Sequence, residues 1–188
     1  ELEKAPGGKG ERASQENGQT ALIFGHSQAG WDWAGGALKK ALEESGIKTF
    51  RWAHTGAKDD KLATEITKIN AEAKEGETWA QKRFPGIHMV QFDHAFLFLG
   101  GNEKEPGGAG YKGRVAKAAR KDAKDKIISF VISNLGVPKE NITVILAPIN
   151  TDDEWPTAEA LHIENRKHLE GQGVYVYPKI KASKDSFR

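Results

Sequence analysis

The sequence predicts an α/β protein, a three-layer α/β/α sandwich built on a five-stranded parallel sheet, for two reasons. Five short apolar segments of the length of buried strands alternate along the chain with longer segments of helical periodicity. Parallel strands need crossover connections, and helices in right-handed crossovers cover both faces of the sheet. The 188 residues suffice for one domain with a sizeable core, but not for two ordinary domains.

The first strand and helix of this fold flank a short polar loop. Residues 21–24 are apolar and lead into a loop at 25–27 that ends with Ser27. Alanines and leucines spaced by three and four over residues 34–42 predict an amphipathic helix, which ends at Gly46. In an open parallel sheet such a loop lies at the carboxyl edge of the strands, where ligands usually bind.

The rest of the chain repeats the alternation. We expect further strands at 47–52, 92–99, 142–147 and 174–177, and helices at 61–74, 115–135 and 157–169. Residues 53–60 should form a loop that contains His54 and Gly56 at the same edge as Ser27. The segment 92–99 holds the most apolar run, so it should be a central strand, and it leads into the loop 100–103.

Composition bounds the possible functions. With 38% hydrophobic and 29% charged residues, the chain is typical of a globular protein, and no apolar run approaches the roughly 20 residues that span a bilayer. The absence of cysteine excludes disulfides, thiolate catalysis and cysteine metal sites. A net charge of +2 does not indicate a nucleic-acid partner. The compartment stays open.

Residues 1–19 differ in composition from the rest. They hold five glycines or prolines among charged residues and have almost nothing apolar to bury. We expect a flexible arm or linker that could tether the domain at 20–188 to an upstream domain or a protein partner. An ordinary frayed terminus is the alternative.

Three short motifs follow the first three strands: GHSQ at 25–28, a loop glycine at Gly56, and GGNE at 100–103. They resemble the first three sequence blocks of the SGNH (GDSL-like) hydrolase family. The resemblance implies a flavodoxin-like sandwich that hydrolyses acyl esters of small molecules, carbohydrates or lipids without a cofactor. It places the nucleophile on Ser27 and the oxyanion hole on the Ser27 N–H, Gly56 and Asn102. Loss of one such donor can cost about 3 kcal/mol of transition-state stabilisation.

The motifs also depart from the family pattern. His26 and Glu103 stand where the family usually has aspartate, and the family's final block is an aspartate and a histidine three residues apart. Here the corresponding aspartate would be Asp185, and Arg188 stands where the histidine is expected. A serine without a general base is a poor nucleophile. We therefore expect either truncation before the catalytic histidine, or an inactive binding or structural module of a larger assembly such as a virion.

Another histidine could serve as the base. His54 and His26 fall at the edge that carries Ser27, whereas His94 precedes a strand and should lie at the opposite edge. His162 and His168 belong to the last helix. Each of these histidines could equally be structural.

Further polar and aromatic groups admit two interpretations. Asp152, Asp153 and Glu154 could hold a metal ion or form a solvated acidic loop. Three tryptophans could line the floor of a sugar-binding cleft, pack into the core or anchor a loop: Trp31, Trp33 and Trp155.

The long helix begins with a cluster of cations. A solvated outer face or an anionic partner would explain them: Lys112, Arg114, Lys117, Arg120, Lys121, Lys124 and Lys126. A flavodoxin-like nucleotide or flavin binder is a further alternative, although the first loop lacks both GxGxxG and a P-loop lysine.

Overall fold

In a computed structural model, the protein is described over residues 18–72, 92–100, 114–146 and 155–177. Five strands form one parallel sheet in the order β2-β1-β3-β4-β5, as the sequence predicts. They are β1 (Thr20–His26), β2 (Lys48–His54), β3 (His94–Leu99), β4 (Ile142–Leu146) and β5 (Tyr175–Tyr177). The expected arm at 1–19 lies almost wholly outside the described residues.

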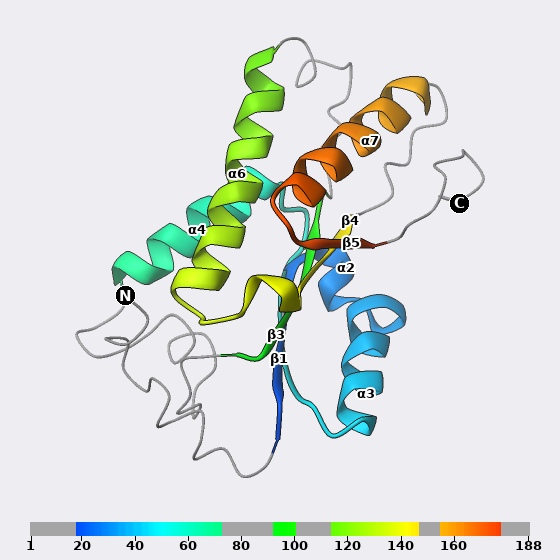
Figure 1. The fold of residues 1–188 in the computed structure, drawn as a ribbon, viewed down its shortest axis with the longest axis vertical. Helices are drawn as coiled ribbons and strands as arrows, with labels where there is room; N and C mark the ends of the chain where they lie inside the picture. The colour runs from blue at the N-terminus through cyan, green and yellow to red at the C-terminus, as the bar shows by residue number, and fades with distance from the viewer. Residues whose placement is uncertain (1–17, 73–91, 101–113, 147–154, 178–188) are drawn as a thin grey trace.

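Helices lie on both faces of the sheet, which confirms the three-layer sandwich (Figure 1). The short helix α2, the π-helix η2 and helix α3 follow β1 on one face, and α4, α6 and α7 cover the other. Their bounds are α2 (Ser27–Gly30), η2 (Asp32–Gly36), α3 (Ala37–Glu44), α4 (Asp59–Glu72), α6 (Arg114–Ser133) and α7 (Trp155–Gly171), with a 3₁₀ turn η4 (Lys139–Asn141) before β4. None of the described helices is both long and apolar enough to cross a bilayer.

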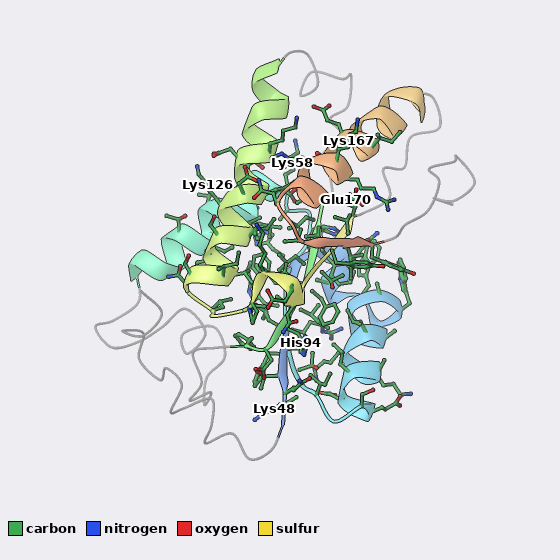
Figure 2. All side chains as sticks on the ribbon, viewed as in Figure 1. Lys48, Lys58, His94, Lys126, Lys167 and Glu170 are labelled. Atoms are coloured by element: carbon green, nitrogen blue, oxygen red, sulfur yellow. The ribbon has the colours of Figure 1, made fainter. Side chains whose placement is uncertain are left out.

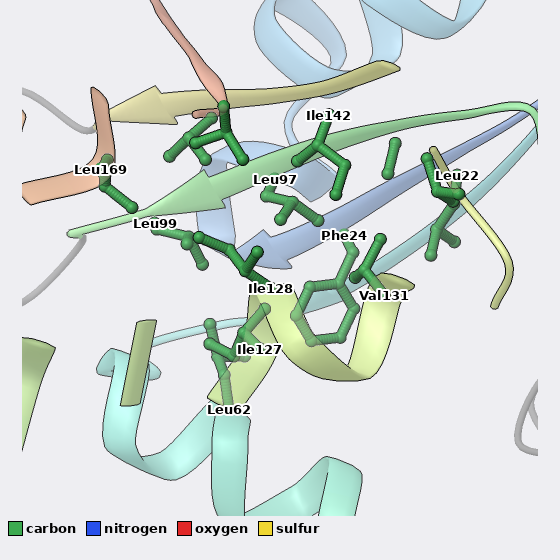
Figure 3. Close-up of a cluster of buried hydrophobic side chains, with 14 of the residues drawn as sticks. Leu22, Phe24, Leu62, Leu97, Leu99, Ile127, Ile128, Val131, Ile142 and Leu169 are labelled. Carbon is green, nitrogen blue, oxygen red and sulfur yellow. The ribbon is translucent and has the colours of Figure 1, made fainter. Parts of the chain in front are cut away.

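The larger core lies between the sheet and α4, α6 and α7. Because successive strand residues point to opposite faces, Leu22 and Phe24 of β1 face this side. Figure 3 shows them near Val131 of α6, with Leu97 of β3 beside them. Complete burial of one such side chain stabilises the fold by roughly 1.5–3 kcal/mol. The smaller core, around Ile23, packs against α3 on the other face.

Two element boundaries differ from those expected, and both differences affect the candidate site. β2 continues two residues further than predicted, because it pairs with β1 up to the partners His26 and His54. His54 is therefore the last residue of a strand and not a loop residue. α4 begins at Asp59 instead of residue 61, because acidic residues in a first turn interact favourably with the helix dipole.

The strand order creates a natural binding position. β1 lies between β2 and β3, so the chain leaves β1 toward one side of the sheet and later returns to build the other. In open α/β sheets, ligands bind at such a switch point, outside the carboxyl ends of the strands. Ser27 directly follows β1 and Gly100 directly follows β3, so both residues are at this position.

Candidate active site

Ser27 sits on a tight turn that the glycine before it makes possible. Gly25 has φ = 151°, and a Cβ at this position would lie 2.1 Å from the carbonyl oxygen of Phe98 in β3. Only glycine allows β1 and β3 to approach so closely. Ser27 itself is half-buried and is the first residue of α2. The turn thus places the half-buried Ser27 at the carboxyl edge of the sheet.

His26, the residue before Ser27, stabilises this turn. It is buried, and its Nδ1 accepts a hydrogen bond from the Gln28 N–H at 3.3 Å, which caps α2. Burial lowers the pKa of His26 from its usual 6.5. The negative charge of Asp59 and, to a smaller extent, the Leu99 backbone oppose this shift. The buried Nε2 makes no hydrogen bond of standard geometry within the described ranges. A neutral, buried imidazole whose acceptor nitrogen is occupied is suited to support the turn and not to act as a general base.

His54 is in a different environment. It pairs in register with His26, so it lies at the strand end next to the one that Ser27 follows. Its Nδ1 lies 2.7 Å from Oε2 of Glu65 on α4, and about a quarter of each side chain is exposed, 27% and 26%. A carboxylate at Nδ1 favours the tautomer with its proton there, which leaves Nε2 free to accept a proton. Within the described residues, however, the Ser27 hydroxyl makes no hydrogen bond to His54 or to another side chain.

The predicted oxyanion residues are described only in part. Gly56 is exposed with φ = 75°, in a turn closed by a hydrogen bond from the Ala57 N–H to the His54 carbonyl at 3.3 Å. It lies at the expected edge, two residues beyond the end of β2. Asn102, Glu103 and Asp185 lie outside the described residues, so their roles remain predictions.

A buried ion pair at the same edge was missed by the sequence analysis. The Asp59 carboxylate accepts hydrogen bonds from the Gly100 N–H, at 2.9 Å to Oδ1 and 3.2 Å to Oδ2. Lys124 Nζ lies 2.7 Å from Asp59 Oδ2, and both side chains are 0% exposed. The expectation that Lys124 belongs to a solvated basic face is therefore wrong for this residue.

A signal for its burial was present in the sequence. Lys124 is spaced by three and four from the buried residues Ile127, Ile128, Val131 and Leu135, which places it on the apolar stripe of α6. A lysine on that stripe needs a buried partner of opposite charge. The identity of the partner could not be deduced, because Asp59 is 65 positions away in the sequence and meets Lys124 only in the fold.

The other histidines do not contribute to this edge. His94 is the first residue of β3, at the opposite end of the sheet, where Nε2 lies 3.0 Å from Gln19 Oε1. Figure 2 shows His94 at the lower end of the sheet and Lys58, which follows β2, at the upper end. His168 Nε2 lies 2.7 Å from Asp125 Oδ1 and links α7 to α6. The His162 side chain lies outside the described part.

Two tryptophans form an exposed aromatic surface beyond α2. Trp31 is 42% exposed and Trp33 is 71% exposed, so the interpretation that they pack into the core is wrong. Their ring centroids are 5.1 Å apart at an angle of 36°. With Gly30 and Asp32 they line an open hollow of about 550 Å³. The Trp155 side chain is not among those described.

An apolar groove adjoins this surface. It has a volume of about 570 Å³ and runs over the sheet face that α3 covers only in part. Trp33 and Gln28 line one side, and Phe98 and Tyr177 line the sheet side. Since Gln28 directly follows Ser27, the groove begins close to the candidate nucleophile.

The acidic loop that could hold a metal, Asp152 to Glu154, lies outside the described residues. Among the residues that are described, no three His, Asp or Glu side chains gather where they could hold a metal ion.

No protein-family model and no curated protein sequence matches the chain significantly. The fold, however, is similar to solved SGNH hydrolases. AlinE4, an SGNH-hydrolase family esterase, superposes with a TM-score of 0.50 at 15% identity over 88% of this chain and 78% of AlinE4. A variant of Axe2, an acetyl xylan esterase from Geobacillus stearothermophilus, superposes with a TM-score of 0.50 at 14% identity over 90% of this chain and 80% of Axe2. The chain therefore has the fold of the SGNH hydrolases.

Proposed function

We propose that the protein is a serine hydrolase of the SGNH type that cleaves acyl esters with Ser27 as its nucleophile. The observation that carries the proposal is the position of Ser27: a half-buried hydroxyl on a glycine-dependent turn after β1, at the switch point of an SGNH-hydrolase fold. Serines on strand-to-helix turns of this kind act as nucleophiles in other α/β hydrolases.

We assign the general base to His54 and its orientation to Glu65. Support comes from the 2.7 Å contact between Nδ1 and the carboxylate, and from the register that sets His54 beside the strand end before Ser27. Nε2 would accept the Ser27 proton as Oγ bonds to the ester carbonyl carbon, and the carbonyl electrons would move to its oxygen. The C–O bond to the alcohol would then break, with the alcohol taking that proton, and water would release the acyl group in the same way.

The resting state has no hydrogen bond between Ser27 and His54, so the proposal requires that substrate binding bring them together. Catalytic hydrogen bonds are often long before substrate binds and tighten in the reactive complex. Asp185 is the orienting acid that the family resemblance suggests, and variants of Glu65 and Asp185 distinguish the two assignments.

The developing oxyanion would be stabilised by three donors: the N–H groups of Ser27 and Gly56 and the side chain of Asn102. The positive φ of Gly56 and its place at this edge support its part in the proposal. Removal of one donor is expected to lower kcat by about 10²- to 10³-fold.

We propose carbohydrate esters as the substrate class. The exposed pair Trp31 and Trp33 offers ring faces for stacking against a sugar, and Asp32 between them offers an acceptor for hydroxyl groups. One neighbour with a similar fold is described as an acetyl xylan esterase, which agrees with this choice.

A non-catalytic binding module is the second candidate, favoured by the absence of a hydrogen bond between Ser27 and any described base. Hydrolysis of p-nitrophenyl acetate separates the two. We expect Ser27→Ala and His54→Ala each to lose at least about 10³-fold in kcat, because the members of such a unit act together. His94→Ala, a matched change at the opposite edge, should keep the wild-type rate.

Other outcomes have distinct meanings. Equal rates for wild type and Ser27→Ala would contradict the hydrolase proposal and favour the binding module. A Ser27-dependent rate that survives His54→Ala would reject His54 as the base but retain the nucleophile.

A further inference from the structure

We propose that Asp59, held in place by Lys124, is a positioning residue that fixes the start of the loop after β3, beside the turn that carries Ser27. The inference rests on the proposed function, but part of its test is independent of activity. Three segments meet at this point: the first turn of α4 at Asp59, the end of β3 at Gly100, and α6 at Lys124.

The first argument is the geometry at Gly100. Its N–H faces both oxygens of the Asp59 carboxylate, at 2.9 and 3.2 Å, and its φ is 77°. This residue sets the direction in which the chain leaves β3, two positions before Asn102. A carboxylate that fixes the Gly100 N–H therefore fixes the start of the candidate oxyanion loop.

The second argument concerns the charge. Asp59 and Lys124 are both fully buried at a separation of 2.7 Å. Desolvation makes such a pair a poor source of stability, and well-packed apolar residues in its place are often as stable or more stable. A simple packing role would therefore not require ions here. A buried carboxylate does, however, provide a rigid acceptor that holds a backbone N–H in one orientation.

The third argument concerns the place of Gly100 relative to the turn that carries Ser27. β1 and β3 pair in parallel up to the partners Gly25 and Phe98, which lie two residues before Ser27 and Gly100 respectively. Because the two strands end side by side, a fixed Gly100 holds the start of the loop after β3 next to the Ser27 turn.

The test measures kcat and KM for p-nitrophenyl acetate together with hydrogen exchange of the Gly100 amide by NMR. We expect Asp59→Ala to lower kcat about 10²-fold or more with KM changed less than about threefold, because a displaced oxyanion donor affects the transition state. Gly100 exchange should accelerate. Asp59→Asn, which keeps an acceptor, should rescue both readouts in part, and it is the variant to use if Asp59→Ala does not fold.

Lys121→Met is the matched control. Lys121 lies one turn before Lys124 on the same helix and pairs with Glu164 at 2.8 Å on the surface. It should change neither kcat nor Gly100 exchange, whereas Lys124→Met should change both.

Failure of the inference and failure of the proposed function can be told apart. Unchanged kcat in Asp59→Ala, with faster Gly100 exchange, would make the pair merely structural and overturn the positioning role. Unchanged Gly100 exchange would overturn the inference entirely. If the wild type lacks Ser27-dependent hydrolysis, the proposed function fails, and the inference is then decided by Gly100 exchange alone.

Discussion

Replacement of Lys124 by methionine should destabilise this protein far more than a surface lysine replacement on the same helix. Lys124 and Asp59 are 0% exposed and lie 2.7 Å apart, so removal of the ammonium takes from a buried carboxylate the positive charge that lies against it. Breaking a buried pair in this way costs about 3–5 kcal/mol. Methionine fills most of the space of the lysine stem, so the loss reflects charge and not a cavity.

The control variant, Lys121→Met, shows how much stability is lost when a surface lysine of the same helix is replaced. Lys121 and Glu164 are 35% and 32% exposed, and a pair of this kind contributes only about 0–1 kcal/mol. For a protein of this size, 1 kcal/mol corresponds to roughly 2–4 °C in Tm. Lys124→Met should therefore lower Tm by about 6–20 °C, and Lys121→Met by less than about 4 °C.

Urea unfolding followed by tryptophan fluorescence is the assay. The double variant Asp59→Asn with Lys124→Met should recover at least about 2 kcal/mol relative to Lys124→Met, because it removes the buried negative charge that Lys124 no longer offsets and keeps an acceptor for the Gly100 N–H. If Lys124→Met came within about 1 kcal/mol of Lys121→Met, the reasoning from the loss of a buried ion pair would be refuted.

Three further predictions each concern a single residue. Since burial lowers the pKa of His26 below 6.5, the unfolded state binds more protons than the folded state. The free energy of unfolding should therefore fall as pH drops below 6.5, with a slope of up to about 1.4 kcal/mol per pH unit. His26→Asn should lose this slope in urea titrations at several pH values, and an equal slope in the variant would contradict the prediction. Trp33→Ala should raise KM for acetylated xylo-oligosaccharides about three- to tenfold and leave p-nitrophenyl acetate unaffected, whereas equal effects on both esters would remove the stacking role. Gly25→Ala should cost about 3 kcal/mol or more, because its Cβ would meet the Phe98 carbonyl at 2.1 Å, and a loss under about 1 kcal/mol would be inconsistent with that contact.

Much of the fold could be predicted from the sequence, because its signals are local. Each strand is a short apolar run and each helix shows helical periodicity, so the five strands and the layer arrangement could be predicted from these patterns. The ends of elements were less predictable, because pairing between strands decides them: β2 extends to His54 because β1 continues beside it as far as His26.

The candidate site was predictable where motifs follow strands and not where distant helices contribute. Ser27 and Gly56 lie at the predicted edge because strand ends determine their place. Glu65 and Asp59 were missed, because an acidic residue on a helix resembles an ordinary solvated one until the fold supplies its partner. Asn102 and Asp185 remain predictions.

The central claim is that Ser27 is a nucleophile, and trapping the acyl intermediate tests it most directly. Protein mixed with p-nitrophenyl acetate, quenched in acid and digested, is analysed by mass spectrometry. The proposed mechanism predicts an acetyl group on the Ser27 hydroxyl in the wild type, and much slower formation of it in His54→Ala, since the base takes the Ser27 proton in this step. Ser27 left unmodified, with ester hydrolysis unchanged in Ser27→Ala, would contradict the claim.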